Sequence, residues 1–198
     1  PLAYLLARYH FKGHRLLSVL VELPIVLPPA VAGLALLLAF GRNGLLGAWL
    51  LAWFGVSLPF TSAAVVIAQT FVSMPFYVRT AQVGFQSIPP VLEEAARVDG
   101  ADAVATMFYI TLPLARRALV AGMLLSWARA LGEFGATILF AGSLEGRTQT
   151  LSLLVYNAFE RDLDAAIWTA VVLIAVAMAT MLVARSLFRE TDRNDALT

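Results

Sequence analysis

Long apolar blocks alternate with short polar segments along this chain, and four of the blocks are long enough to cross a lipid bilayer. A helix needs roughly 20 mostly apolar residues to span the hydrocarbon core, and an isolated strand would leave its backbone groups unpaired in lipid. We therefore expect four full transmembrane helices. They correspond to Leu16–Phe40, Leu58–Phe85, Ala118–Ala141 and Ala165–Ala184.

Two shorter apolar blocks predict helices that do not span the bilayer by themselves. The block PLAYLLARY opens the chain at Pro1, and we interpret it as the end of a first transmembrane helix whose beginning lies outside this sequence. Leu151–Phe159 follows a Gly-rich turn and predicts a short helix at the membrane surface. Because there is no internal repeat and no linker, we expect residues 1–198 to form a single membrane domain.

Prolines interrupt the first full block and predict a kink or break near its middle. Pro24, Pro28 and Pro29 lie in this block, and a proline removes a backbone donor and restricts the residue before it. Carbonyl groups freed by such a break are tolerated only inside protein or beside a water-filled cavity. Leu27–Gly33, including Pro28 and Pro29, could thus line a translocation path, or the break could serve packing alone.

The polar stretch between the second and third blocks predicts a short helix followed by a sharp break. Pro89 and Pro90 suit a helix start, and Glu93 and Glu94 fall in the first turn, where the helix dipole favours acidic side chains. Asp99-Gly100 then ends the helix, because glycine readily adopts the left-handed conformation at a helix C-terminus.

A second short helix is expected from about Asp102 to Thr111, ending near Pro113. Together the two short helices form a stiff knob between two spans, with a charged end and an alanine-lined side. Such a shape suits recognition by another protein.

Composition agrees with a membrane protein and excludes several kinds of chemistry. The chain is 60% hydrophobic and 14% charged, with a mean hydropathy of +0.80. It contains no cysteine, so disulfides and thiolate catalysis are excluded. His10 and His14 stand four residues apart but have no carboxylate nearby, so we expect no metal site. The only lysine, Lys12, follows Phe11, so a phosphate-binding P-loop is absent and any ATP must be hydrolysed by a partner.

Basic residues predict the orientation of the chain in the membrane. Ten of the 14 Lys and Arg residues lie in three clusters on alternate polar segments. The clusters are Arg8, Lys12 and Arg15; Arg79, Arg97, Arg116 and Arg117; and Arg185, Arg189 and Arg193. By the positive-inside rule these segments face the cytoplasm. The loop 87–117 and the C-terminus are therefore expected inside the cell, and the loops 41–57 and 142–164 outside.

The motif Glu94-Ala95-Ala96, three residues, Gly100, nine residues, Ile110-x-Leu112-Pro113 resembles the EAA loop of membrane permeases in bacterial and archaeal ATP-binding-cassette (ABC) importers. The resemblance implies an all-α, polytopic bundle with the type I importer permease fold, in which this loop docks on a cytoplasmic ATPase subunit. The residues that it assigns to coupling are Glu93, Glu94, Ala95, Ala96, Asp99, Gly100 and Ala101. The alternative is an amphipathic hairpin lying on the bilayer, which the glutamate pair disfavours at an anionic inner leaflet.

Two further stretches, LPIVLPPAVAGLALLLAFGRNGLLG and ARALGEFGATILFAGSLEGRTQTLSLLVYNAFERDLDAA, resemble permeases for molybdate and tungstate, with sulfate and thiosulfate permeases close behind. One departure is Ser152, where the family pattern leads us to expect proline. The resemblance implies uptake of a tetrahedral oxyanion across a bacterial or archaeal inner membrane. The implied partners are a solute-binding protein, a second permease copy, membrane lipid and two ATPase subunits that bind ATP and Mg. The resemblance implies that this chain itself binds no cofactor and no nucleic acid.

Polar residues within the predicted spans are candidates for the translocation path, because buried charge is expensive in a bilayer. Arg129 and Glu133 stand four apart and could pair on one helix face, in a polar stripe that Ser126 and Thr137 extend. The stripe could line the path or its gate, or the ion pair could brace a subunit interface. Gln69, Ser73 and Tyr77 repeat every four residues and could face the same cavity or bond neighbouring helices.

Two other classes of protein fit the sequence less well. A membrane-embedded enzyme would need a nucleophile, a base and an orienting group around Arg129 and Glu133, and the sequence offers no such set. An ion-coupled secondary transporter would more often show repeated groups of spans, and none is present. We therefore expect a transport subunit rather than an enzyme.

Overall fold

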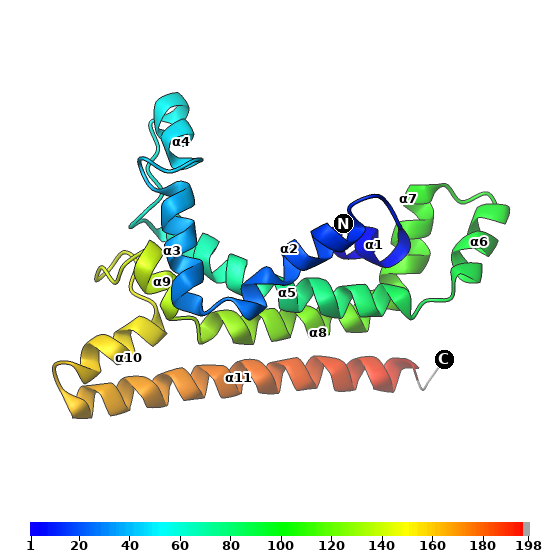
Figure 1. Cartoon of the computed structure of the whole chain (residues 1–198). Coiled ribbons are helices and arrows are strands. Elements are labelled where there is room, and N and C mark those ends of the chain that lie inside the picture. Colours follow the sequence, from blue (N-terminus) through cyan, green and yellow to red (C-terminus); the bar gives the residue numbers. More distant parts are fainter. Residues whose placement is uncertain (196–198) are drawn as a thin grey trace.

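The computed structural model describes the backbone of residues 1–195 and the side chains of residues 1–183, and every regular element in this part is a helix (Figure 1). The elements are α1 Leu2–Arg8, α2 His14–Val26, α3 Pro29–Phe40, α4 Gly47–Phe54, α5 Ser62–Gln86, α6 Pro90–Val98, α7 Ala103–Thr106, the π-helix η1 Met107–Thr111, α8 Leu112–Leu131, α9 Gly135–Phe140, α10 Leu151–Phe159 and α11 Leu163–Asp195. The predicted helices at the start of the chain and at Leu151–Phe159 are confirmed.

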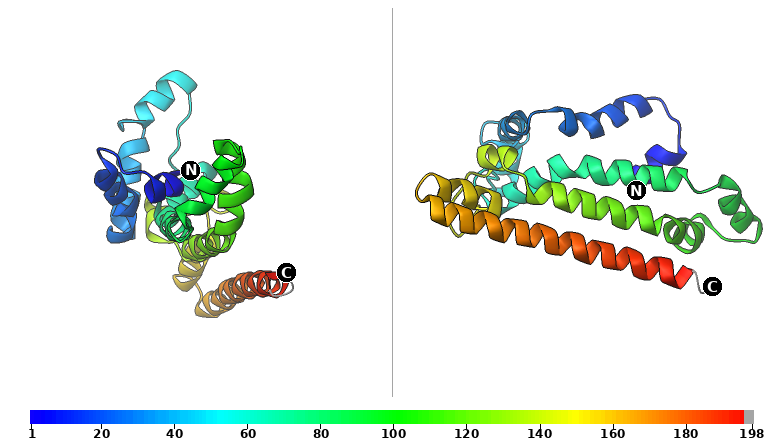
Figure 2. Two further views of the ribbon diagram at one scale, coloured as in Figure 1. Left: turned by 90° about the vertical axis from the view of Figure 1, so that its right-hand side faces the viewer. Right: turned by 90° about the horizontal axis from the view of Figure 1, so that it is seen from below.

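Three long helices, α5, α8 and α11, run side by side and set the axis of the molecule (Figures 1 and 2). Helix α8 packs against both α5 and α11. The loop 87–117, with α6 and α7, lies at the same end of this bundle as the C-terminal end of α11 (Figure 1). Helices α4 and α10 lie at the opposite end. The basic cluster Arg185, Arg189 and Arg193 belongs to a stretch of α11 whose side chains lie outside the described residues.

The first apolar block is broken at its prolines, as predicted, but the break divides it into two separate helices. Helix α2 ends at Val26, Leu27 and Pro28 are extended, and α3 begins at Pro29. Because Pro29 has no backbone N–H and a fixed φ, it suits the first position of a new helix. The axes of α2 and α3 differ by 119°, so α3 leaves the direction of the bundle and carries α4 away from it (Figure 1).

The predicted continuous helix over Ala118–Ala141 is wrong, because the helix ends at Leu131 and a new one begins at Gly135. Backbone and side-chain groups of Glu133 are used in the intervening turn. Its carbonyl oxygen accepts a hydrogen bond from Ser152 (2.7 Å), and its carboxylate accepts the N–H of Ala136 in α9 (2.8 Å). These bonds replace the helical pairing that the apolar pattern predicted.

The predicted end of the second short helix near Pro113 is also wrong. The chain continues from Ala103 to Leu131 as one 29-residue helical run. A π-helical turn at Met107–Thr111 comes directly before Leu112 and Pro113. A π-turn changes the hydrogen-bond register locally, which accommodates a proline that would otherwise interrupt the regular ladder.

By length and composition, two described helices can cross a membrane, Ala103–Leu131 and Leu163–Val183, and the bent pair α2–α3 makes a third if it is one broken span. Helix α5 has 25 residues, enough to span, but it carries Gln69, Ser73, Arg79 and Gln82. It lies within the bundle, where the side chains of Gln69, Arg79 and Gln82 bond to α8, α2 and α1. The four predicted apolar blocks thus all form helices, and the two helical runs that meet these criteria overlap the third and fourth blocks.

Close backbone contact holds α3 against α9. A Cβ atom on Gly33 would lie 2.7 Å from the Ala136 Cα, and one on Gly135 would lie 2.9 Å from the Pro29 Cβ. The apolar cluster at this crossing includes Ala32, Leu36 and Phe140, all buried. The broken first span is thereby fixed to the broken third span at the level of Arg129 and Glu133.

Candidate functional site

The loop 87–117 begins with a well-terminated helix whose outer side is exposed. Helix α6 ends in a pair of hydrogen bonds from Gly100 N–H to the Arg97 carbonyl (3.1 Å) and from Ala101 N–H to the Ala96 carbonyl (2.9 Å). Gly100 has a φ of +94°, a conformation that residues with a side chain rarely adopt. This Schellman arrangement confirms the predicted helix break at Asp99-Gly100.

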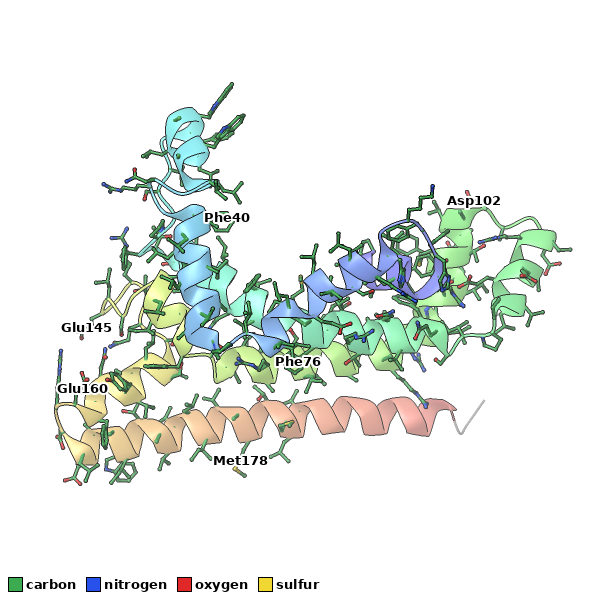
Figure 3. The ribbon with its side chains drawn as sticks, viewed as in Figure 1. Phe40, Phe76, Asp102, Glu145, Glu160 and Met178 are labelled. Carbon is green, nitrogen blue, oxygen red and sulfur yellow. The ribbon has the colours of Figure 1, made fainter. Side chains whose placement is uncertain are left out.

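The second arm of the loop is also capped. The Asp102 carboxylate accepts the N–H of Ala105 (2.7 Å) at the start of α7, and Figure 3 shows Asp102 at the outer end of the loop. Serine, threonine, aspartate and asparagine caps of this kind stabilise helix starts by about 1 kcal/mol. Two capped helices joined through Gly100 and Ala101 form a defined elbow, which we call the α6–α7 elbow (residues 90–106).

The residues assigned to coupling do not all face outward. Glu94, Ala95, Asp99 and Gly100 are exposed, and Ala96 and Ala101 are half-buried. Glu93 is 6% exposed and points into the molecule. The elbow therefore presents Glu94 and Ala95 to its surroundings and keeps Glu93 for internal contacts.

Glu93 joins three parts of the chain. Its carboxylate lies 3.0 Å from the Arg8 guanidinium at the end of α1 and accepts a hydrogen bond from the Thr111 hydroxyl in η1 (2.9 Å). Arg8 also donates to the Ile88 carbonyl (3.0 Å) just before α6. These contacts stabilise the base of the elbow against the first helix of the chain.

Large apolar side chains accompany Glu94 on the surface of the loop. They are exposed although they lie outside the apolar blocks: Val91, Val98, Val104, Phe108 and Tyr109. An exposed apolar surface with a charged residue beside it is typical of a protein–protein contact. The predicted knob with a charged end is therefore present, and its apolar part is larger than alanines alone would provide.

At the end of α8 away from the elbow, Arg129 and Glu133 form the predicted ion pair, with 2.8 Å between guanidinium and carboxylate. The Glu133 side chain is 1% exposed and that of Arg129 is 28% exposed. Arg129 and Glu133 line an open cavity of about 520 Å³ together with Pro29 and Ala30 at the start of α3 and Ile138 of α9. One side of this cavity thus carries a partly exposed positive charge.

The predicted polar stripe does not lie on one helix. Ser126 and Arg129 belong to α8, Glu133 lies in the turn after it, and Thr137 belongs to α9. Thr137 is fully buried, and its hydroxyl has no hydrogen-bond partner among the described residues. The turn between Leu131 and Gly135 places Thr137 on a different helix from Ser126 and Arg129, so Thr137 does not extend their surface.

Gln69, Ser73 and Tyr77 line a different cavity, of about 460 Å³, which Ser126 also lines from α8. The Gln69 side chain donates to the Ala130 carbonyl of α8 (3.3 Å), and the backbone carbonyl of Ser73 accepts a hydrogen bond from the Ser126 hydroxyl (3.0 Å). The polar groups therefore join α5 to α8. Of the proline pair, Pro29 lines the Arg129 cavity and not this one.

Hydrogen bonds also fix the helix at the opposite end of the bundle. The Thr150 hydroxyl accepts the Leu153 N–H at the start of α10, and Asn157 donates to the Ser143 hydroxyl. A hydrogen bond with Glu160 raises the pKa of Tyr156 above its usual value. Figure 3 shows Glu145 and Glu160 at this end, far from Asp102.

His10 and His14 stack, with ring centroids 5.4 Å apart, and His14 Nε2 contacts the Leu6 carbonyl (3.1 Å). Within the described residues, no group of three or more histidine, aspartate or glutamate side chains is placed to hold a metal ion.

Sequence reasoning missed the partners of several charged residues. In the sequence Arg8 is only one member of a basic cluster, yet it bonds to Glu93 from a position 85 residues away. Likewise Arg79 pairs with Glu22 of α2 (2.8 Å). A charged residue at the end of an apolar block can signal such a pair, but its partner depends on how the helices pack.

Comparison with known proteins gives one family. The chain matches the family "Binding-protein-dependent transport system inner membrane component" over residues 1–193. It is 43% identical over 178 residues to the probable transport system permease protein NifC of Clostridium pasteurianum, covering 90% of this chain and 62% of that protein. It therefore spans less than two thirds of that relative's length.

Two Escherichia coli K12 proteins are also similar. The molybdenum transport system permease protein ModB is 38% identical over 189 residues, covering 94% of this chain and 82% of that protein. The sulfate transport system permease protein CysT is 40% identical over 178 residues, covering 89% and 64%.

A solved structure confirms the fold. A chain of a bacterial ABC transporter involved in the import of the acidic polysaccharide alginate superposes with a TM-score of 0.75 at 20% identity, covering 96% of this chain and 70% of that chain. The all-helical architecture is thus that of an ABC importer permease. The chain belongs to the family of inner membrane components of binding-protein-dependent transport systems.

Proposed function

We propose that this chain is the permease subunit of an ATP-driven importer that translocates a tetrahedral oxyanion, molybdate or tungstate, and that a separate ATPase subunit grips the α6–α7 elbow. The observation that carries this proposal is the elbow itself: a capped, exposed helix pair at one end of the long helices, within a chain of this family. The elbow lies on the loop 87–117, which we place in the cytoplasm from its basic residues, as we do the C-terminus.

The surface of the elbow supports a docking role. Glu94 and Ala95 are exposed on α6 beside Val91 and Val98. Small and apolar side chains allow close approach by a partner, and an exposed carboxylate adds a specific charged contact. The two caps keep the elbow in one shape, so a force applied to α6 reaches α8 through the continuous helix from Ala103 to Leu131.

The likeness to a molybdenum transport permease over nearly the whole chain supports the choice of substrate. In the proposed mechanism, a solute-binding protein docks on the external loop 142–164 and the loop before α5, and releases the oxyanion into a path between two permease copies. Closure of two ATPase subunits on ATP and Mg then moves both elbows, and the bundle alternates between outward and inward openings. Two-fold assembly is the simplest way to close a path between like subunits.

The cavity at Arg129 is the part of the proposed path best suited to an anion, because it carries a positive charge. The guanidinium is partly exposed and faces a cavity bordered by Pro29. Glu133 neutralises part of this charge, which keeps attraction weak enough for the substrate to leave. Gln69, Ser73 and Ser126, in the second cavity, would form a polar wall nearer the elbow.

Reconstitution tests the proposal. The full-length permease, its ATPase and its solute-binding protein are placed in liposomes, and uptake of radiolabelled molybdate is measured with ATP, with a non-hydrolysable analogue and with ion gradients alone. We expect uptake only with ATP and the binding protein. Uptake driven by an ion gradient without ATP would reject the importer proposal.

A sulfate or thiosulfate permease is the second candidate, because the sulfate transport permease CysT is 40% identical. Competition in the same assay separates the two. Unlabelled tungstate should abolish molybdate uptake at concentrations where sulfate has little effect. The reverse order of competition would favour the sulfate assignment.

A further inference from the structure

The C-terminal turn of α1, Leu6–Arg8, bonds to three helices near the base of the elbow: α6, α5 and the start of α2. Its two ends reach in different directions. Arg8 bonds to Glu93 of α6, while the Leu6 carbonyl accepts hydrogen bonds from Gln82 of α5 (3.2 Å) and from His14 at the start of α2 (3.1 Å).

The link from this turn to the elbow is a buried ion pair. The side chains of Arg8 and Glu93 are 13% and 9% exposed. Thr111 supports the carboxylate, and the Ile88 carbonyl supports the guanidinium. Charges attract more strongly where water is excluded, and separating such a pair leaves an uncompensated buried charge. Helix α6 therefore resists moving away from Arg8.

The link from the same turn to the spans is both apolar and polar. Ala3 and Leu6 are buried against Val78, Ala81 and Phe85 of α5. On α5, Arg79 donates to Gln82 (3.1 Å) and also pairs with Glu22 of α2 (2.8 Å). Helix α2 leads directly to the break at Pro28.

We propose that Leu6–Arg8 is a hub that carries movement of α6 to α5 and α2, with Arg8 as the positioning residue that holds Glu93. Movement of the elbow then reaches the broken first span by a route separate from the continuous helix Ala103–Leu131. This inference rests on the proposed function, in which α6 is the part that the ATPase moves. The hub adds a second contact path, formed by the first helix of the chain.

A double substitution separates a relay from a merely structural contact. In the reconstituted complex, Arg8→Met and Glu93→Gln are each expected to lower the thermal stability and to reduce molybdate taken up per ATP hydrolysed at least tenfold. The double variant Arg8→Met with Glu93→Gln removes both charges. It should regain most of the stability and still bind the ATPase, yet its uptake per ATP should stay at least tenfold below that of the wild type.

Two controls sharpen the test. Arg15→Met removes an exposed charge in the first turn of α2 and should leave uptake per ATP unchanged. Arg8→Lys keeps a positive charge beside Glu93 and should retain at least half of the wild-type ratio. If uptake per ATP is as low for Arg8→Lys as for Arg8→Met, the ion pair does not link α6 to the hub.

The hub would be overturned by a double variant that regains the wild-type ratio together with its stability, because the pair would then serve folding alone. An Arg8→Met variant that folds and retains the wild-type ratio would overturn it as well. Uptake by the wild type without ATP would reject the proposed function and the hub together. The wild-type measurement therefore tests the proposed function, and the variant measurements test the hub.

Discussion

The Glu133 carboxylate bonds at once to the Arg129 guanidinium, at 2.8 Å, and to the backbone N–H of Ala136, also at 2.8 Å. It thus neutralises a charge on α8 and fixes the start of α9. The crossing of α9 with α3, where the first span is broken, depends on that start. One buried side chain therefore connects the charged cavity to the packing of both broken spans.

Removing Arg129 alone should be worse than removing both charges. Arg129→Met leaves a carboxylate that is 1% exposed without its cation, and we expect a loss of about 3 kcal/mol in stability, at the low end for a buried pair because Arg129 is partly exposed. Arg129→Met with Glu133→Gln removes both charges, and the glutamine oxygen can still accept the Ala136 N–H. Thermal unfolding in detergent measures the stability of the single and the double variant. An equal loss of stability in the two variants would show that the carboxylate is not paired with Arg129.

Reversing the exposed charge on α6 should weaken ATPase binding without disturbing the bundle. Glu94→Lys changes an exposed side chain, so the protein should insert and unfold as the wild type does, while recovery of the ATPase in a pull-down falls at least tenfold. Glu145→Lys makes the same change at the opposite end (Figure 3) and is the matched control. Normal ATPase recovery with Glu94→Lys would remove Glu94 from the docking surface.

Substitution of Gly100 should act through the backbone alone. Its φ is +94°, and a Cβ there would meet nothing within 4 Å, so the penalty is the left-handed conformation itself, about 1–2 kcal/mol. Gly100→Val should distort the elbow and reduce ATPase recovery, whereas Gly100→Asn, which tolerates this region better, should retain most of it. The same pair of changes at Gly146, with a φ of +69°, should leave ATPase recovery intact. Equal recovery for valine and asparagine at position 100 would contradict this account.

The crossing of α3 and α9 should not tolerate a larger residue. A Cβ on Gly33 would lie 2.7 Å from backbone atoms of Ala136, which cannot move aside as a flexible side chain does. Gly33→Ala should therefore destabilise the protein by about 1–3 kcal/mol through overpacking. Gly132→Ala is the control, since a Cβ there has open space. Unfolding temperatures that are the same for both variants would show that the helices can separate without penalty.

The sequence predicts most helices here because they depend on nearby residues: apolar blocks form helices, and prolines and Asp99-Gly100 begin or end them. It predicts turns poorly where polar groups from distant segments decide the path. Glu133 lies in an apolar block that reads as one helix, and its turn depends on bonds to Ser152 and Ala136. Pro113 reads as a stop, but the π-turn before it lets the helix continue.

The candidate site was predictable in position and only partly in arrangement. The motif located the elbow, and the spacing of Arg129 and Glu133 predicted their pairing. Glu93 and Glu94 look equivalent in the sequence, yet the partner that separates their roles, Arg8, is brought near by packing of α1 on α5. The cavity at Arg129 likewise depends on the 119° bend between α2 and α3, because Pro29 and Ala30 line it, and the prolines indicate this bend without giving its angle.

The central claim, that an ATPase subunit grips the α6–α7 elbow, is tested most directly by crosslinking in the assembled transporter. The chain has no cysteine, so cysteines introduced at Val98 and at Leu45, each 88% exposed, can carry the same photoreactive label at the two ends of the molecule. We predict an adduct with the ATPase from position 98 and none from position 45. An adduct from position 45, or no adduct from position 98 in a complex that transports, would contradict the account.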